Sequence, residues 1–191
     1  MRIAVLALQG AFIEHEMMLE RLGAETFEVR KYADWFQQKD ALIIPGGEST
    51  TMGKILRDEQ LLEPIRTAIK EGLPVMGTCA GMILLAKNAA EANGTESGNT
   101  RLATMDISVK RNAYGRQLGS FETTAAFKGL GEIPMTFIRA PYIEATHGDA
   151  ETLATVDGRI VAARQGKQLA CAFHPELTES TCLHEYFLSM I

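Results

Sequence analysis

The sequence has few cysteines and no long apolar run, and each absence excludes a class of protein. Its three cysteines are an odd number at scattered positions without a C-x-x-C pair. This argues against a disulfide framework or a zinc site and favours free thiols in a reducing compartment. No stretch approaches the roughly 20 apolar residues that a membrane-spanning helix requires. The apolar start, Met1 to Leu8, is too short for a signal peptide and lacks its layout. We therefore expect a cytoplasmic protein, and we assign it no metal and no cofactor.

Runs of basic residues are also missing, since the nearest example is the pair Lys110-Arg111. The net charge of -5 and the pI near 5.4 argue against nucleic acid or an anionic membrane as the main partner. The composition is that of an ordinary globular protein, with 46% hydrophobic and 23% charged residues. No internal repeat or linker divides the 191 residues, so we expect one domain over 1–191.

The first half of the chain alternates between apolar runs and helical periodicity. The runs predict buried strands at Arg2 to Leu8, Thr26 to Val29, Ala41 to Ile44 and Pro74 to Gly77. Helical spacing predicts helices at Phe12 to Leu22, Leu61 to Ile69 and Ala80 to Ala90. This order is typical of a parallel sheet with crossover helices, and therefore of the α/β class.

The second half is richer in strands. A polar surface loop is expected at Ala92 to Thr100. Strands are expected at Asp106 to Val109, Ser120 to Ala126, Thr136 to Ile138, Leu153 to Val156, Ile160 to Ala163 and Leu169 to Phe173, with hairpin turns at 156–159 and 165–167. A last helix is expected at Ser180 to Met190, with Ser180 as its cap. These strands predict a small antiparallel extension of the parallel sheet.

Gly77-Thr78-Cys79-Ala80-Gly81 joins an apolar strand to an apolar helix. The pattern is that of a nucleophile elbow with cysteine in place of serine. Glycines two positions on either side leave room for the neighbouring chain. A thiol at a helix N-terminus is favoured as thiolate, and the N–H of Ala80 points to where an oxyanion forms. The alternative is a buried cysteine in an ordinary strand-to-helix turn.

Phe173-His174-Pro175-Glu176 follows the last apolar strand and supplies a base. A cysteine nucleophile needs a nearby base, and that base needs an acceptor on its other nitrogen. Pro175 restricts His174 to an extended conformation, in which residues two apart project to the same side. Glu176 can then fix the tautomer of His174. The alternative is a strand-end histidine beside a solvated glutamate.

Pro45-Gly46-Gly47-Glu48-Ser49 is a third loop that follows an apolar strand. Its glycines let the backbone approach a ligand at the carboxyl end of the sheet, where they are able to complete an oxyanion hole opposite Ala80. A plain tight turn is the alternative. A phosphate-binding loop is excluded, because the spacing from Gly47 to Gly53-Lys54 is wrong and Ile55 follows.

The remaining cysteines and histidines receive no catalytic role. Cys171 lies inside a predicted strand and Cys182 in the terminal helix. His15 stands between two glutamates on a polar helix face and is expected to be solvated. His147 and His184 are assigned no role.

Several motifs occur together in one order along the chain. They are Leu8-Gln9-Gly10, Gly46-Gly47-Glu48-Ser49-Thr50-Thr51-Met52, Gly77-Thr78-Cys79-Ala80-Gly81, Arg111-Asn112, Gly115-Arg116-Gln117, Phe137-Ile138-Arg139-Ala140-Pro141 and Phe173-His174-Pro175-Glu176-Leu177-Thr178. The series resembles class I, or triad, glutamine amidotransferases, and within them the glutaminase subunits of pyridoxal 5'-phosphate synthases. The resemblance covers essentially the whole chain. It implies one glutaminase domain, a flavodoxin-like three-layer sandwich with a mostly parallel central sheet.

The resemblance also implies an activity, a site and a partner. The activity is hydrolysis of L-glutamine to glutamate and ammonia through a γ-glutamyl thioester, with Cys79, His174 and Glu176 as the triad. Gly47, Glu48, Ser49, Arg111, Ile138 and Arg139 would bind glutamine, and the backbone of Gly47 and Ala80 would form the oxyanion hole. The partner implied is the synthase (lyase) subunit, in a large hetero-oligomer that consumes the ammonia. We assign Gln9, beside the oxyanion loop, to coupling between docking and that loop.

Three departures from the family pattern stand outside the triad. They are Tyr142 in place of histidine, Ala113-Tyr114 in place of Ser-Phe, and Ala103 in place of glycine. Three other functions remain open: another class I amidotransferase glutaminase, a related cysteine hydrolase such as a small peptidase or deglycase-like enzyme, and a non-catalytic module that binds a synthase. The hydrolase would need neither His174-Pro175-Glu176 nor the Gly46-Gly47-Glu48 loop.

Overall fold

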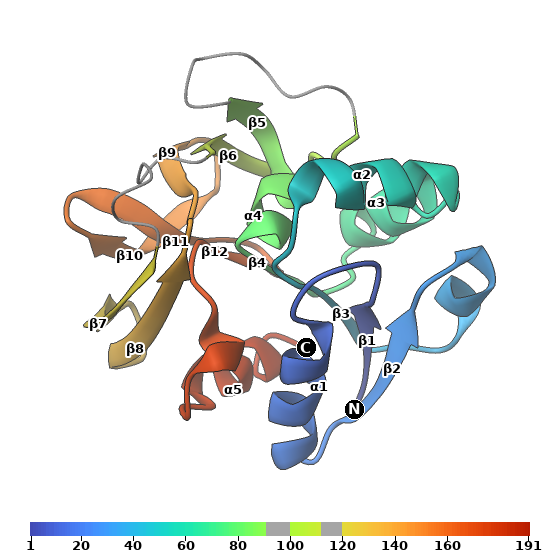
Figure 1. Cartoon of the computed structure of the whole chain (residues 1–191), viewed down its shortest axis with the longest axis horizontal. Helices are drawn as coiled ribbons and strands as arrows, with labels where there is room; N and C mark the ends of the chain where they lie inside the picture. The colour runs from blue at the N-terminus through green and yellow to red at the C-terminus, as the bar shows by residue number, and fades with distance from the viewer. Residues whose placement is uncertain (91–99, 112–119) are drawn as a thin grey trace.

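The computed structural model describes residues 1–90, 100–111 and 120–191 (Figure 1). The loop predicted at Ala92 to Thr100 lies outside the described residues except for Thr100. Asn112, Ala113-Tyr114 and Gly115-Arg116-Gln117 lie outside them as well.

Parallel strands form one half of a single sheet. They run in the order β2-β1-β3-β4-β12. Their bounds are β1 Arg2–Leu6, β2 Glu25–Val29, β3 Ala41–Ile44, β4 Val75–Thr78 and β12 Gln168–Cys171. Every residue of β3 and β4 is buried, as expected of strands covered on both faces. The strands predicted at these places are therefore confirmed.

Helices cover both faces of this parallel half and create three layers, as expected. Figure 1 shows α1 and α5 on one face and α2, α3 and α4 on the other. The α-helices span α1 Phe12–Arg21, α2 Ser49–Asp58, α3 Leu62–Lys70, α4 Ala80–Leu85 and α5 Cys182–Leu188, and two 3-10 turns span η1 Tyr32–Phe36 and η2 Pro175–Leu177. The buried side chains between the layers form one continuous hydrophobic core.

The antiparallel part is larger than the predicted small extension. From β12 the sheet continues in antiparallel pairs as β11-β10-β7-β8, and β9 pairs antiparallel with β11 and β6, whereas β5 joins β6 in parallel. The strands span β5 Ala86–Ala90, β6 Met105–Lys110, β7 Ser120–Phe127, β8 Gly131–Ile138, β9 Tyr142–Thr146, β10 Glu151–Val156 and β11 Arg159–Gln165. Strand β9, which the sequence pattern did not predict, follows Pro141 and carries Tyr142 beneath the guanidinium of Arg159.

The helices differ from the predicted ones in three places. The helix expected to reach Ala90 ends at Leu85, because 86–90 pairs in parallel with β6 from Ala86 opposite Met105. The helix α2 was missed, since its sequence is mostly polar and it begins inside the glycine loop motif. The helix α5 begins at Cys182, and its N-cap is Thr181 instead of Ser180.

Ala103 adopts a left-handed backbone with φ +52°. This conformation is uncommon for residues with a Cβ and is readily adopted by glycine. Glycine would adopt this backbone without the steric cost of a Cβ.

Candidate active site

Cys79 occupies a strained turn between β4 and α4. Its backbone has φ +48° and ψ -101°, a sparsely populated region for a residue with a side chain. The Cys79 N–H donates to the Cys171 carbonyl of β12 at 2.8 Å, which ties the turn to the neighbouring strand. A Cβ on Gly81 would lie 2.0 Å from the Ile44 carbonyl oxygen, so this position requires glycine. The structure thus has the elbow that the sequence indicates.

His174 comes to Cys79 because β4 and β12 are adjacent parallel strands that end at the same edge of the sheet. The His174 N–H donates to the Thr136 carbonyl at 2.8 Å, and its ring lines the same cavity as Cys79. A Cβ on Gly46 would meet His174 Cε1 at 2.4 Å and Cys79 Cβ at 3.4 Å. Gly46 therefore packs directly against the His174 ring and Cys79, and this contact leaves no room for a side chain at position 46.

Glu176 lies behind His174 in the turn η2. His174 Nδ1 is 2.7 Å from Glu176 Oε1, and the carboxylate side chain is fully buried. Burial lowers the pKa of His174, but hydrogen bonds with Cys79 and Glu176 outweigh it and raise the pKa to about 10. Burial likewise opposes ionisation of Glu176, yet the His15 ring and the His174 hydrogen bond lower its pKa. The pair is therefore an imidazolium beside a carboxylate at neutral pH.

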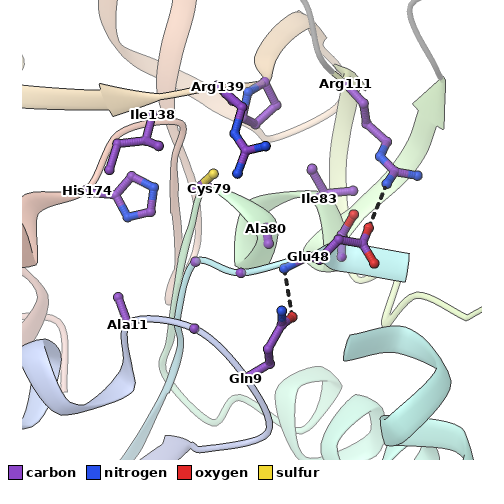
Figure 2. A pocket seen from close by; sticks show the side chains of 15 residues that line it. Gln9, Ala11, Glu48, Cys79, Ala80, Ile83, Arg111, Ile138, Arg139 and His174 are labelled. Carbon is purple, nitrogen blue, oxygen red and sulfur yellow. Dashed lines mark hydrogen bonds and ion pairs between the residues drawn. The ribbon is translucent and has the colours of Figure 1, made fainter. Parts of the chain in front are cut away.

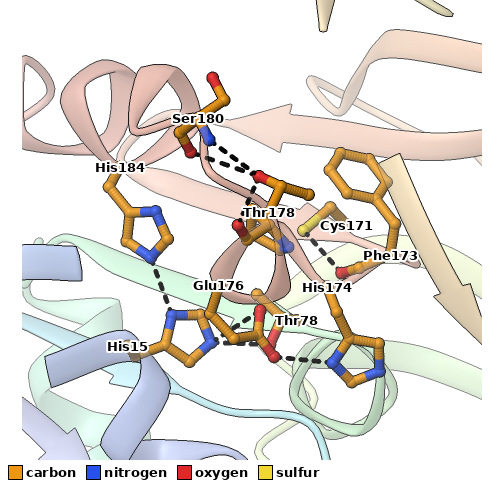
Figure 3. Close-up of polar contacts among 10 residues, drawn as sticks. His15, Thr78, Cys171, Phe173, His174, Glu176, Thr178, Ser180 and His184 are labelled. Atoms are coloured by element: carbon orange, nitrogen blue, oxygen red, sulfur yellow. Dashed lines mark hydrogen bonds and ion pairs between the residues drawn. The ribbon is translucent and has the colours of Figure 1, made fainter. Parts of the chain in front are cut away.

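His15, expected to be solvated, is completely buried behind this pair. Its Nε2 lies 3.3 Å from Glu176 Oε2 and 3.1 Å from Thr78 Oγ1, and its Nδ1 lies 2.9 Å from His184 Nε2 (Figure 3). The solvation prediction is wrong because α5 and η2 cover the helix face that the sequence alone presents as polar. His184, to which no role was assigned, is also fully buried.

The loop at Gly46, Gly47 and Glu48 is held against the loop that follows β1. Gln9 Oε1 accepts a hydrogen bond from the Glu48 N–H at 2.8 Å, and the Ala11 N–H donates to the Gly46 carbonyl at 3.3 Å (Figure 2). A Cβ on Gly10 would lie 1.7 Å from that same carbonyl oxygen. The two loops therefore pack as one unit beside Cys79.

A cavity of about 440 Å³ opens above these groups. It is lined by Gln9, Gly10, Ala11, Gly46, Gly47, Glu48, Ser49, Cys79, Ala80, Ile83, Arg111, Ile138, Arg139, Pro141 and His174. All the site residues expected from the sequence are in this lining except Glu176, which lies behind His174. Ile83 and Pro141 were not anticipated, since an apolar helix residue and a turn proline carry no chemical signal in the sequence.

Two arginines give the cavity wall a positive charge. The Arg139 guanidinium points into the space beside Cys79 (Figure 2), from a backbone with φ +43°. Arg111 Nη2 lies 3.3 Å from Glu48 Oε1 and 3.0 Å from Thr50 Oγ1. A small ligand with a carboxylate is the natural occupant of such a wall.

The Glu48 carboxylate also caps α2. It accepts from the N–H groups of Thr50 at 3.0 Å and Thr51 at 2.7 Å, and from the Thr51 hydroxyl at 2.7 Å. Burial opposes its ionisation, but these hydrogen bonds prevail and lower its pKa to about 2. Glu48 is therefore an anion that links helix α2, the loop at Gly46 and Gly47, and Arg111.

The described residues offer neither a metal centre nor a membrane-spanning helix. No group of three or more His, Cys, Asp or Glu side chains among them is placed to hold a metal ion. Within the same residues no helix is long and apolar enough to cross a membrane.

A cysteine on an elbow, with a His–Glu pair behind it and a cavity in front, is the arrangement of a triad hydrolase with a cysteine nucleophile. Residues 5–191 match the SNO glutamine amidotransferase family. The chain belongs to this family.

The chain is similar over its full length to two curated relatives. It is 59% identical over 191 residues to the pyridoxal 5'-phosphate synthase subunit PdxT of Methanocorpusculum labreanum, covering 100% of this chain and 98% of that protein. It is 56% identical over 193 residues to the subunit of the same name from Streptococcus pneumoniae strain CGSP14, covering 100% and 97%.

Solved structures show the same fold. One, described as a glutamine amidotransferase, is 46% identical with a TM-score of 0.90 and covers 98% of this chain and 97% of that one. Another, a glutamine amidotransferase from Thermotoga maritima, is 16% identical with a TM-score of 0.64, covering 99% and 83%. At that identity the second likeness concerns the fold alone.

Proposed function

We propose that this chain is a glutaminase, a single domain that hydrolyses L-glutamine with Cys79, His174 and Glu176 and delivers the ammonia to a pyridoxal 5'-phosphate synthase subunit in a cytoplasmic hetero-oligomer. The observation that carries the proposal is the alignment of the Cys79 thiol, the His174 ring and the Glu176 carboxylate at one end of the cavity. Both relatives are named as subunits of a pyridoxal 5'-phosphate synthase, which supports the choice of partner.

The first half of the reaction forms a thioester. The Cys79 thiolate attacks the side-chain amide carbon of glutamine, and the carbonyl oxygen becomes an oxyanion that accepts from the N–H groups of Gly47 and Ala80. As the tetrahedral intermediate collapses, the bond between carbon and nitrogen breaks. His174 gives its proton to the nitrogen, so that ammonia leaves and a γ-glutamyl thioester remains.

The second half of the reaction hydrolyses the thioester and regenerates the free enzyme. Neutral His174 takes a proton from water, the hydroxyl oxygen attacks the thioester carbon, and the bond to sulfur breaks to release glutamate and the Cys79 thiolate. Glu176 keeps Nδ1 of His174 protonated in both halves, so that Nε2 is the nitrogen that exchanges protons. The His174 pKa of about 10 suits the acid role, since the ring is already charged at neutral pH when ammonia must leave.

Glutamine has a zwitterionic end that the cavity wall matches. Arg139 points into the cavity with a planar fork of donors, which suits the α-carboxylate through a bidentate contact. Glu48 remains ionised because of its helix-capping hydrogen bonds, and its charge suits the α-ammonium group. Arg111 and Thr50 hold that carboxylate in place, while Ser49 and Ile138 complete the wall.

Release of glutamate from glutamine, by wild type and by Cys79→Ala, with and without a pyridoxal 5'-phosphate synthase subunit, tests the proposal. We expect activity that rises when the synthase subunit is present and disappears in Cys79→Ala, while circular dichroism shows both proteins folded. A folded wild-type protein that releases no glutamate under any condition would exclude the glutaminase function. An active Cys79→Ala variant would exclude the mechanism.

Gln9 is proposed to couple docking to the oxyanion loop. Its side chain holds the Glu48 N–H and its loop packs on Gly46, so any displacement of the first loop is transmitted to Gly47. Gln9→Ala should reduce activity with the synthase subunit more than activity without it. Equal stimulation of Gln9→Ala and wild type would contradict this role, and Gln38→Ala on the opposite, exposed edge serves as the control.

A further inference from the structure

A line of buried polar side chains continues beyond the triad, on the side of Glu176 that faces away from His174. It consists of His15 from α1, His184 from α5 and Thr78, the residue before the nucleophile (Figure 3). The side chains of His15 and Glu176 are 0% exposed, and His184 and Thr78 are 0% exposed as residues. Burial of so many polar groups is unfavourable unless they are paired, so their arrangement calls for a reason.

Glu176 has one oxygen for His174 and a second oxygen that faces His15. Oε1 lies 2.7 Å from His174 Nδ1. Oε2 is shielded from solvent and accepts no hydrogen bond from the described residues. His15 Nε2, at 3.3 Å from Oε2, is the polar group that the fold places against this charge.

The position of the protons on both rings follows from these contacts. If His184 Nε2 carries its proton and donates to His15 Nδ1 over 2.9 Å, then neutral His15 has its proton on Nε2, toward Glu176 and Thr78. The opposite assignment aims a lone pair of His15 at a carboxylate and leaves the buried N–H of His184 Nδ1 without a partner. Unpaired buried N–H groups are rarer than unpaired acceptors, and the repulsion is unfavourable as well.

We propose that His15 is a positioning residue of the glutaminase reaction: oriented by His184, it holds the Glu176 carboxylate against His174 and braces Thr78 beside Cys79. This rests on the proposed function. His15 touches neither the cavity nor the substrate, so its effect reaches the reaction only through Glu176 and Thr78.

The charges around the rings support this role. Burial lowers the pKa of His15 and outweighs the opposing effect of Glu176, while the charge of His174 lowers it further and Glu14, on its own helix, raises it. Burial lowers the pKa of His184 to about 3. His174 itself is faced by Cys79, Glu176 and His15, and Arg139 lines the same cavity. His15 and His184 are therefore neutral, and they do not compete with the His174 imidazolium for the charge of Glu176.

His15→Met and His15→Gln separate positioning from packing. Methionine fills the space but donates no hydrogen bond, whereas the amide of glutamine reaches as far as Nε2 and restores the donor. In the complex with the synthase subunit, we expect His15→Met to lower kcat by roughly 10-fold to 100-fold, part of the ~10² to 10⁴ that general acid–base catalysis contributes. KM for glutamine should stay within about 2-fold, because His15 is outside the cavity.

The pH profile gives a readout that packing alone would not move. A less firmly held Glu176 stabilises the imidazolium less, so the alkaline decline of kcat should move to lower pH in His15→Met and return in His15→Gln. His147→Met, which replaces a histidine that contacts Ser108 Oγ at 3.0 Å, should leave kcat, KM and the profile unchanged.

An NMR titration of the His174 ring in the isolated chain tests the same coupling without any turnover, and it remains informative if the chain proves to have no glutaminase activity. The His174 pKa should be lower in His15→Met than in wild type and close to wild type in His15→Gln. Should His15→Met not fold, His15→Asn replaces it, since its amide is too short to reach Glu176. Unchanged kcat, pH profile and His174 pKa in a folded variant would overturn the proposal, as would a loss of kcat that glutamine at position 15 does not restore.

Discussion

Position 46 admits no side chain, because the ring of His174 lies where a Cβ would be. The Cβ of Gly46→Ala would fall 2.4 Å from His174 Cε1, well inside van der Waals contact. The ring must then move away from Cys79, and displacement of a reacting group by about 1 Å typically costs 10²-fold in rate. We expect kcat of Gly46→Ala to fall by about that factor.

Gly158→Ala is the matched control for this substitution. It lies in the turn between β10 and β11 with open space around its Cβ position and φ +73°, so it introduces backbone strain far from the site. We expect Gly158→Ala to lower the free energy of unfolding and to leave kcat unchanged. If Gly46→Ala kept the wild-type kcat, the close packing of Gly46 against the His174 ring would not constrain the reaction.

Single residues also show what sequence reasoning can and cannot reach. Cys79, His174 and Glu176 could be predicted as a triad because each lies in a short motif whose chemistry is local. His15 was not, because its partner His184 is 169 positions away and its burial depends on α5 folding over α1. A histidine between two glutamates carries no local sign that its ring points inward.

At the scale of elements, the first turn of α4 is fitted tightly against β3. A Cβ on Gly81 would lie 2.0 Å from the Ile44 carbonyl oxygen, and both groups belong to the backbone, so neither can rotate away. Overpacking of this kind typically costs about 1–3 kcal/mol. Gly81→Ala should lower the urea midpoint of unfolding accordingly, and an unchanged midpoint would contradict the close approach of α4 to the sheet.

The same region explains the largest error in the predicted elements. Ala80 to Ala90 reads as one apolar helix, yet the chain leaves the helix at Leu85 and continues as β5. Pairing with β6 supplies backbone hydrogen bonds to residues distant in sequence, and this tertiary gain outweighs local helix propensity. The parallel strands were easier to predict, since burial on both faces leaves a continuous apolar run.

At the scale of the whole molecule, two buried neutral histidines make the fold sensitive to acid. The unfolded chain binds protons on His15 and His184 near the ordinary value of 6.5, whereas burial lowers both pKa values in the folded state. Stability is therefore lost as pH falls below 6.5, by at most about 1.4 kcal/mol per pH unit for each ring. Below pH 6.5 His174 does not contribute to this slope, because its raised pKa gives stability that is complete there and is lost progressively as pH rises from 6.5 to about 10.

Urea unfolding of wild type and His184→Gln at several pH values between 7 and 5 measures this effect. Wild type should lose stability steadily over this window, and His184→Gln should show a shallower slope even if it is less stable at pH 7. Parallel slopes for the two proteins would mean that His184 is protonated in the folded state, against the burial that the structure gives it.

The proposed mechanism requires the Cys79 sulfur to become covalently bound to the γ-glutamyl group. Intact-mass and peptide mass spectrometry of the chain, quenched with acid during turnover of glutamine in the synthase complex, tests it most directly. We expect a mass gain of one γ-glutamyl group on Cys79, retained in Cys171→Ser and Cys182→Ser and absent in Cys79→Ala. Glutamate release with the adduct on another residue, or unaltered release by Cys79→Ala, would contradict it.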